Sequence, residues 1–302
     1  PDEQGNVTAA DYILMNDIVL ENYTPVDTTY FRSLDGNGYQ IYISSFNTSG
    51  ANSTLNLALF NQVASTSTIK NVRVNLYNAG QLTINVNQFT NINIAGFALT
   101  NNGTIYNCEV VAYYDENHSV SRVSGNTGIV VNFVRGNGTD YVHLTSQDIS
   151  VSNVNISGFV NTNNSIITNS RVGGTSIGTV IETDDPNLNY YSEVLLPLFT
   201  IQGQGTVAGF VNNNVGTISA SFANNVQINN QMNSTTSITS GFAVNNTGDI
   251  NTSYTQGAES ESSSSSDGRT YYFDGSTIAS TGRVAGFIYN NSGIVKNSYV
   301  NI

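Results

Sequence analysis

A fifteen-residue phrase occurs five times in this 302-residue chain, and it constrains the fold more than any other feature. The copies begin at Gly96, Gly158, Gly209, Gly241 and Gly286, at intervals of 62, 51, 32 and 45 residues. Repeated units of constant length stack on their neighbours, while insertions of variable length leave the stack as loops. A fixed phrase with variable intervals therefore favours a solenoid.

Four positions of the phrase keep one kind of residue in every copy. The second position is Phe: Phe97, Phe159, Phe210, Phe242 and Phe287. The sixth is Asn: Asn101, Asn163, Asn214, Asn246 and Asn291. The tenth is Ile or Val, and the thirteenth is Cys or Ser. Stacking would align each position into a file, with a core aromatic file and an Asn ladder whose amides bond from coil to coil.

Within one copy, apolar segments flank a turn rich in Asn and Gly, which predicts two short strands around a sharp corner. Five hairpins of a β-sandwich that share a turn are the alternative. Hairpins would not require Phe, Asn and a small residue at the same offsets each time. We therefore predict an all-β fold, a parallel β-helix with loop insertions.

The phrase resembles the GLUG-type repeat of bacterial and protist surface proteins. Its opening Gly-Phe, its Asn/Gly turn and its closing Ile-x-Asn-Cys-x-Val, as in Ile105–Val110, carry the resemblance. The segments Tyr12–Leu20 and Phe31–Ile41 are similar to the lead-in of adhesin-like β-helix domains, and Ala58–Val72 resembles a degenerate first unit. Ala220 departs from the pattern, because most copies carry Asn there. The resemblance implies a right-handed β-helix scaffold on an extracellular surface protein, without enzyme activity.

We expect a lead-in and cap region over residues 1–57 and a repeat β-helix over 58–302, continuous with 12–57. The chain starts at Pro1 rather than Met, which fits a processed or excised segment.

Charge excludes several partners. The net charge is −12, and the nine Lys and Arg residues are scattered singly. Nucleic-acid binding requires a basic stripe, so it is excluded. No apolar run reaches the roughly 18 residues of a transmembrane helix, so we expect no membrane insertion.

Residues with catalytic or metal-binding chemistry form no recognisable site. Cys108 is the sole cysteine and is expected to be a packed structural thiol. His118 and His143 lack metal-ligand spacing, and Asp184-Asp185 indicates a turn. The sequence thus predicts no catalytic residue, cofactor or metal, although some β-helices are polysaccharide-active enzymes that place paired carboxylates on consecutive coils.

Asn-x-Ser/Thr sequons are frequent, as any Asn-, Ser- and Thr-rich chain would produce. One of them, at Asn22, is doubtful because Pro25 follows its Thr. The candidate glycosylation sites are Asn6, Asn47, Asn52, Asn102, Asn117, Asn137, Asn155, Asn163, Asn233, Asn245, Asn251 and Asn290.

Three segments interrupt the repeat and are the preferred positions for a partner site: Asp115–Asp140, Thr175–Leu198 and Glu259–Asp274. The chain stops directly after a copy, where a terminal coil would expose strand edges. We therefore expect an extracellular structural subunit of a surface fibre or layer. Its partners would be copies of itself or further repeats, with glycans as further partners. An adhesin or carbohydrate-binding stalk is the alternative.

Overall fold

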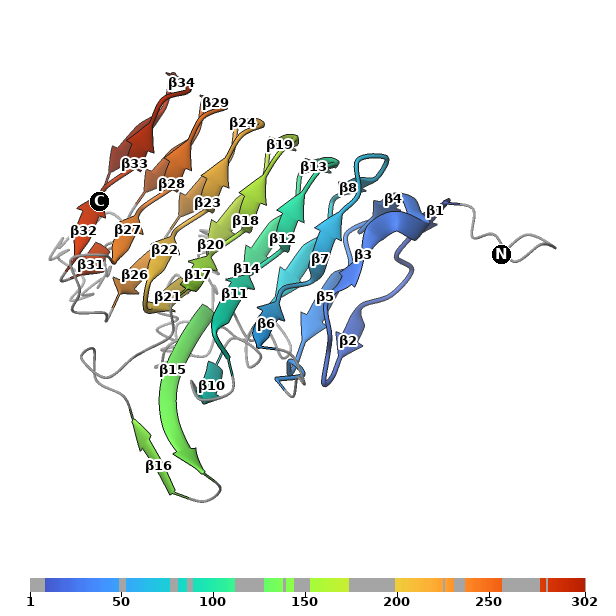
Figure 1. The fold of residues 1–302 in the computed structure, drawn as a ribbon. Coiled ribbons are helices and arrows are strands. Elements are labelled where there is room, and N and C mark those ends of the chain that lie inside the picture. The colour runs from blue at the N-terminus through green and yellow to red at the C-terminus, as the bar shows by residue number, and fades with distance from the viewer. Residues whose placement is uncertain are drawn as a thin grey trace, which may run out of the picture.

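The chain winds into a parallel β-helix, which confirms the predicted all-β solenoid (Figure 1). The computed structural model describes residues 9–48, 53–76, 81–85, 89–111, 128–137, 140–143, 153–173, 199–224, 226–230, 237–256, 278–280 and 282–301. A complete coil passes through five sheets, here named I to V in chain order. Neighbouring strands within each sheet come from successive coils and run parallel, apart from one antiparallel pair in sheet IV.

Sheets I, II and III hold the repeated phrase. Sheet I contains β3 (Val26–Asp27), β7 (Phe60–Val63), β12 (Ala98–Asn101), β18 (Val160–Asn163), β23 (Val211–Asn214), β28 (Ala243–Asn246) and β33 (Ile288–Asn291). Sheet II contains β1 (Ala10–Ile13), β4 (Phe31–Asp35), β8 (Thr68–Lys70), β13 (Thr104–Tyr106), β19 (Ile166–Thr168), β24 (Thr217–Ser219), β29 (Asp249–Asn251) and β34 (Ile294–Lys296). Sheet III contains β2 (Ile18–Leu20), β5 (Gln40–Ile43), β9 (Arg73–Asn75), β14 (Glu109–Val111), β20 (Arg171–Gly173), β25 (Phe222–Asn224), β30 (Tyr254–Gln256) and β35 (Tyr299–Asn301).

Sheets IV and V close each coil. Sheet IV contains β10 (Gln81–Asn85), β15 (Gly128–Asn137), β21 (Phe199–Gly203), β26 (Val226–Asn230) and β31 (Ile278–Ser280), and β16 (Asp140–His143) pairs antiparallel with the end of β15. Sheet V contains β6 (Thr54–Leu57), β11 (Asn91–Ala95), β17 (Asn153–Ser157), β22 (Thr206–Ala208), β27 (Ile238–Ser240) and β32 (Arg283–Ala285). A single 3-10 turn, η1 (Thr28–Tyr30), links β3 to β4.

Each copy of the phrase forms three strands and two corners, one strand and one corner more than the sequence predicts. The second corner lies at the twelfth position, where one residue takes a left-handed conformation in every copy. These residues are Asn107, Asn169, Ala220, Thr252 and Asn297, with φ of 51°, 49°, 46°, 49° and 50°. Asn adopts this conformation with less strain than most residues, so a single residue can turn the chain from sheet II to sheet III.

The glycine that opens each copy is required by close stacking of the coils. A Cβ atom built on Gly209 would lie 1.9 Å from the carbonyl oxygen of Gly241, its counterpart in the next coil. The same contact at Gly158 would be 2.1 Å, from the oxygen of Gly209. No side chain fits there, which explains why this position never varies.

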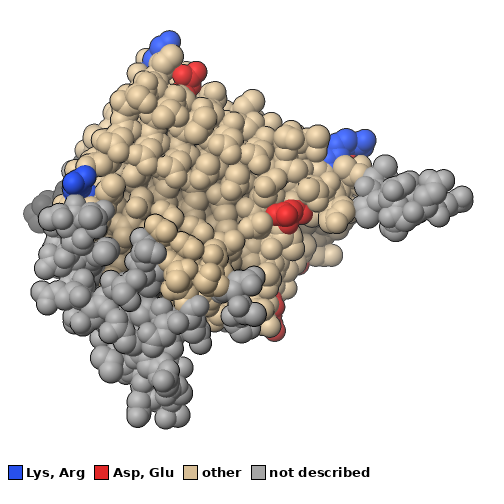
Figure 2. Space-filling view, viewed as in Figure 1, with Lys and Arg blue, Asp and Glu red and all other residues tan. Residues whose placement is uncertain are grey.

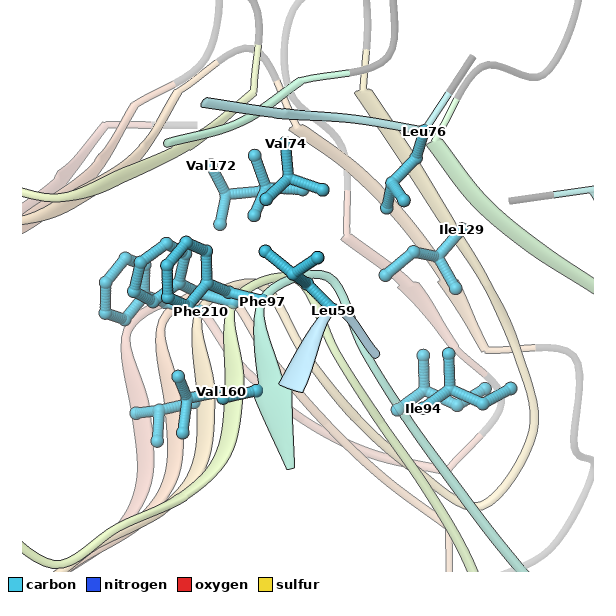
Figure 3. Close-up of a cluster of buried hydrophobic side chains, with 14 of the residues drawn as sticks. Leu59, Val74, Leu76, Ile94, Phe97, Ile129, Val160, Val172 and Phe210 are labelled. Carbon is cyan, nitrogen blue, oxygen red and sulfur yellow. The ribbon is translucent and has the colours of Figure 1, made fainter. Parts of the chain in front are cut away.

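The core consists of files of like side chains along the axis, seen nearly end-on in Figure 3. Phe97, Phe159, Phe210 and Phe242 are fully buried, and their rings stack with centroids 4.7–4.9 Å apart. Ile105, Ile167, Ile218 and Ile250 form a second fully buried file in sheet II. Each such side chain stabilises the fold by about 1.5–3 kcal/mol.

The lead-in strands join the same sheets as the repeats. β1 pairs with β4, and β4 pairs with β8, while β2, β5 and β9 follow one another in sheet III. Two of the first strands are irregular, because the register shifts at Ala10/Asp11 in β1 and at Val26/Asp27 in β3. The division at residue 57 stays a prediction.

Candidate functional site

Ladders of polar side chains are the main feature from which a function can be argued. Among the described residues, no group of three or more His, Cys, Asp or Glu side chains gathers as a metal site would. His118 and Asp184-Asp185 lie outside the described residues, and of His143 only the backbone is described. Within the described ranges, no helix is long and apolar enough to cross a membrane.

The sixth-position asparagines form a buried ladder at the corner between sheets I and II. Nδ2 of each amide donates to Oδ1 of the next, at 2.8 Å from Asn101 to Asn163, 2.8 Å to Asn214, 2.7 Å to Asn246 and 2.7 Å to Asn291. The first four side chains are at most 1% exposed. The turn backbone fixes their orientation: Asn163 Oδ1 accepts from the N–H of Ser165, and its Nδ2 donates to the carbonyl of Ser165.

The thirteenth position, Cys or Ser in every copy, forms a second buried ladder that the sequence did not reveal. Each Ser hydroxyl donates to the carbonyl two residues earlier and accepts the N–H of the matching residue in the preceding coil. Ser170 Oγ accepts from Cys108 N at 3.2 Å, and Ser221 Oγ accepts from Ser170 N at 3.2 Å. The hydroxyls thereby satisfy buried backbone groups at the corner, which an Ala would leave unpaired.

Cys108 stands in this ladder as a buried thiol. Its Sγ contacts the carbonyls of Tyr106 and Ile69 at 3.3 and 3.6 Å. Burial raises the pKa of the Cys108 thiol to about 12, so the reactive thiolate is disfavoured at neutral pH.

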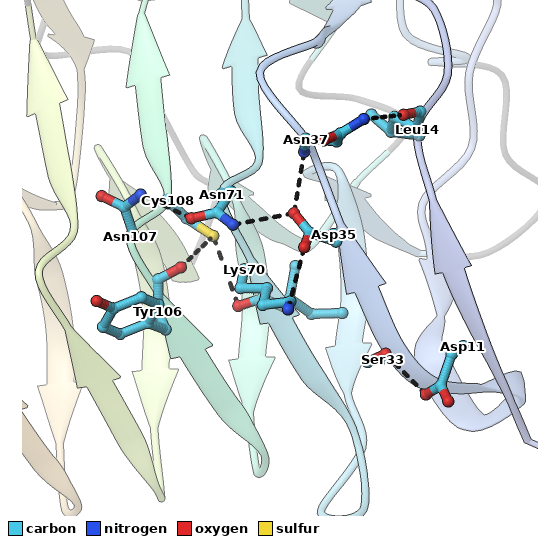
Figure 4. A network of polar contacts seen from close by, with 11 residues as sticks. Asp11, Leu14, Ser33, Asp35, Asn37, Lys70, Asn71, Tyr106, Asn107 and Cys108 are labelled. Atoms are coloured by element: carbon cyan, nitrogen blue, oxygen red, sulfur yellow. Dashed lines mark hydrogen bonds and ion pairs between the residues drawn. The ribbon is translucent and has the colours of Figure 1, made fainter.

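A third ladder lies at the outer corner between sheets II and III, at the left-handed position. Asn71 Nδ2 donates to Asp35 Oδ1 at 2.9 Å and Asn107 Nδ2 to Asn71 at 2.7 Å (Figure 4). In the next coil, Asn169 Nδ2 donates to Asn107 at 3.0 Å. Ala220 and Thr252 interrupt it. We name this series of side chains the corner ladder. The hydrogen bond from Asn71 lowers the pKa of Asp35, and Lys70, at 3.0 Å, acts in the same direction.

One outward file on sheet III consists of charged side chains from Arg73 to Arg171 and of aromatic side chains in the later coils. Glu109 Oε1 forms an ion pair with Nε of Arg73 at 2.6 Å, and Glu109 Oε2 accepts from Nε of Arg171 at 2.8 Å. Beyond Arg171 the file continues as stacked rings, with Phe222–Tyr254 at 4.8 Å and Tyr254–Tyr299 at 5.0 Å. Burial raises the pKa of Tyr254. Because the rings lie nearly parallel, their faces cover one another and offer no stacking surface along the file.

Further amide ladders run along the outer faces of sheets I and V. Asn245 Nδ2 donates to Asn213 at 2.8 Å, and Asn290 donates to Asn245 at 2.8 Å. On sheet V, Asn93 donates to Asn56 at 3.0 Å and Asn155 to Asn93 at 3.1 Å. These donors point to the preceding coil, whereas those of the buried ladder point to the following coil. The sequence analysis missed these ladders, although the fifth position, Thr or Asn in all copies, was a signal.

The candidate glycosylation sites differ in what their amides already bind. Asn163 was a wrong prediction: it is fully buried, and its Nδ2, the atom that a glycan would take, donates to Asn214. Asn155, Asn245 and Asn290 donate Nδ2 to ladder neighbours. Asn102 and Asn251 instead accept at Oδ1.

The other candidate sites yield less. Asn47 is half-buried, and only the backbone of Asn137 is described. Asn6, Asn52, Asn117 and Asn233 lie outside the described residues. Modification at every remaining site stays a prediction.

Long connections leave the coil on one side. Three of them follow β14, β20 and β30 in sheet III, and the chain then returns at β15, β21 and β31 in sheet IV. The corners between sheets I, II and III carry only short turns within the copies. Most of the predicted partner segments, Asp115–Asp140, Thr175–Leu198 and Glu259–Asp274, lies outside the described residues.

Comparison with protein-family models, with curated proteins and with solved structures gave no match. The resemblance to the GLUG-type repeat therefore stays a prediction.

Proposed function

We propose that this chain is a non-enzymatic structural protein, a β-helix unit of an extracellular surface fibre or surface layer. Its partners would be copies of itself or further repeats that extend the helix along its axis. The ladders support this proposal, because buried and outward files of Asn and Ser side chains bond one coil to the next.

One observation carries the proposal. The last described coil along the chain, with β33, β34 and β35, continues the files of the interior coils, but its core side chains are partly exposed. Val295 and Val300 are 36% and 41% exposed, whereas Ile250, which precedes Val295 in its file, is fully buried. The three strands also leave one edge unpaired within the described residues. Such an edge is a template for further parallel strands.

A further coil that pairs with this edge would continue the files, whether it belongs to the same chain or to another copy. A heterologous contact of this kind builds filaments when it does not close. Only 10% of the residues are charged, well below the usual quarter. Copies of this chain therefore place few charges against one another when they pack closely.

Electron microscopy of the native material tests the proposal, with fibre diffraction of aligned samples. We expect filaments or layers with a strong axial repeat near the ~4.8 Å strand spacing. Val295→Lys, which places a charge in the exposed core file, should abolish extension. Ile294→Lys is the matched control, because Ile294 lies in the same strand and faces outward. Native material that contains only isolated globular particles would contradict the proposal.

An adhesin or carbohydrate-binding stalk is a second candidate, favoured by the grouping of long connections between sheets III and IV. A rigid scaffold that presents its loops on one side is a common arrangement for binding. Replacing residues 175–198 by a short Gly/Ser linker should then remove binding on a glycan array and leave the β-helix folded. Unchanged binding in this variant and in matching replacements of residues 115–127 and 259–274 would exclude the loops.

A further inference from the structure

The outer faces of sheets I and V carry less charge than those of sheets II and III. Their strands contain only two charged residues, Asp27 in the first strand of sheet I and Arg283 in the last strand of sheet V. Sheets II and III, by contrast, carry charged residues such as Lys70, Glu109 and Asp249 among their strands. In Figure 2, the centre of the surface formed by sheets I and V shows no charged side chain. Exclusion of charge over several coils is notable in a chain with a net charge of −12.

We define the amide face by its outward side chains. They are Gln62, Thr100, Thr162, Asn213 and Asn245 on sheet I, and Asn56, Asn93, Asn155 and Thr206 on sheet V. Most of these side chains are half-exposed. Depletion of charge is a mark of the centre of protein interfaces, because a charge that loses its water without a partner is costly.

The ladders use only part of the hydrogen-bonding capacity of this face. A primary amide has two N–H donors and two acceptor lone pairs. Asn245 donates once to Asn213 and accepts once from Asn290. One donor and one acceptor of Asn245 therefore remain for a partner. Amides stand in successive coils at Asn213, Asn245 and Asn290 on sheet I, and at Asn56, Asn93 and Asn155 on sheet V.

We propose that a second copy of this chain lies alongside the first and pairs through the amide face. The spacing of the coils selects this partner. Stacked rings in successive coils are 4.7–5.0 Å apart, so the amides repeat with the same period. A partner can meet every amide along the face only if it has the same period, which another copy has by construction. Ladders of identical amides that interdigitate between paired sheets have this geometry.

Charge also favours the amide face over the faces of sheets II and III for contact between copies. Two chains of charge −12 repel each other, and contact through the amide face brings fewer charged side chains together than contact through sheets II or III. Salt shortens the range of the repulsion to about 10 Å at 0.1 M and about 3 Å at 1 M. Pairing should therefore strengthen as salt is raised, opposite to an interface held by ion pairs.

This inference rests on the proposed structural function and adds lateral contact to axial extension. Sedimentation of the purified chain at low and high salt gives the first test. We expect a concentration-dependent dimer that grows with salt, weakened roughly a hundredfold in Asn213→Glu because a charge would be buried in the contact. Thr217→Glu is the matched control, since Thr217 is exposed on sheet II of the same coil.

A cross-linking test locates the contact. Asn213→Cys treated with a short bis-maleimide should give covalent dimers, whereas Thr217→Cys should not be cross-linked. Cys108 does not interfere, because it is 1% exposed. Equal cross-linking of the two variants would overturn the inference, as would a monomer at every salt concentration.

Other outcomes separate the inference from the proposed function. Filaments one solenoid wide, unaffected by Asn213→Glu, would overturn lateral pairing and leave axial extension intact. Retention of a monomeric chain on an insoluble neutral polysaccharide, lost in Asn213→Glu, would assign the face to a glycan instead. A glycan found attached to Asn155 or Asn245 in the native protein would block the face and overturn the inference.

Discussion

Two amide ladders run along the same coils, one in the interior and one at the outer corner. The buried ladder, from Asn101 to Asn291, is Asn in all five copies. The corner ladder begins at Asp35 and includes Asn71, Asn107 and Asn169, but Ala220 and Thr252 interrupt it. The difference follows from water: an amide removed at the outer corner is replaced by solvent, whereas an amide removed inside leaves its neighbours unpaired.

The largest effect is expected from Asn214→Leu in the buried ladder. The substitution leaves one N–H of Asn163 Nδ2 without its acceptor, while the other keeps the Ser165 carbonyl, and it removes the donor that Oδ1 of Asn246 accepts from. Two buried unsatisfied groups should lower the free energy of unfolding by about 4 kcal/mol. Equilibrium denaturation in urea measures this loss, and a loss below about 1 kcal/mol would mean that water reaches the interior corner.

A gain of about 1 kcal/mol is expected from Thr252→Asn in the corner ladder. A β-branched residue is strained at φ of 49°, and Asn relieves that strain. Ala220→Asn should stabilise by less, because Ala has no branch to clash. If Thr252→Asn is destabilising, the left-handed conformation is not what limits this position.

Asn169→Ala in the corner ladder should lower the free energy of unfolding by only about 0.5–1 kcal/mol, much less than Asn214→Leu. Ala already occupies the equivalent position 220, and the amide of Asn169 is exposed. The same denaturation experiment compares it with Asn214→Leu, and similar losses for the two variants would remove the distinction between the ladders.

The smallest effect concerns pH, and only the corner ladder should show it. Asn71 and Lys70 lower the pKa of Asp35 in the folded state, so its contribution to stability is present above the unfolded value near 3.8 and is lost as the pH falls through the folded pKa. The buried ladder contains no ionisable group. Asp35→Asn should therefore flatten the acid side of the stability profile, and an unchanged profile would place the sensitivity elsewhere.

The alignment of the copies predicted the parts of the fold that depend on repetition. Phe97 and its equivalents stack, and Asn101 and its equivalents bond, because a position that recurs in sequence recurs in space once coils stack. The second corner was missed because no single residue type marks it: Ala220 and Thr252 hide the pattern of Asn107 and Asn169. The close approach at Gly209 was also hidden, since an invariant Gly does not reveal which atom excludes its side chain.

Sites whose role depends on burial or on the neighbouring coil were predictable only in part. The sequon at Asn163 is a correct match to the motif, but the same residue belongs to the buried ladder, and burial decides between the two roles. The ionic and aromatic halves of the sheet III file, Glu109 with its arginines and Tyr254 with its rings, share no residue type. Their common position becomes visible only when the fourteenth residues of the copies lie in one line.

The buried and outward amide ladders donate in opposite directions along the axis, and this affects the electrostatic energy of a long stack of coils. Each row of aligned side-chain dipoles adds to its total with every coil, as peptide dipoles do along a helix. The interior row from Asn101 to Asn291 points one way, and the outer rows through Asn93 and Asn213 point the other. Their fields oppose each other, so lengthening the rod accumulates less polarisation at its tips than a single row would, and electrostatics sets a weaker limit on its length.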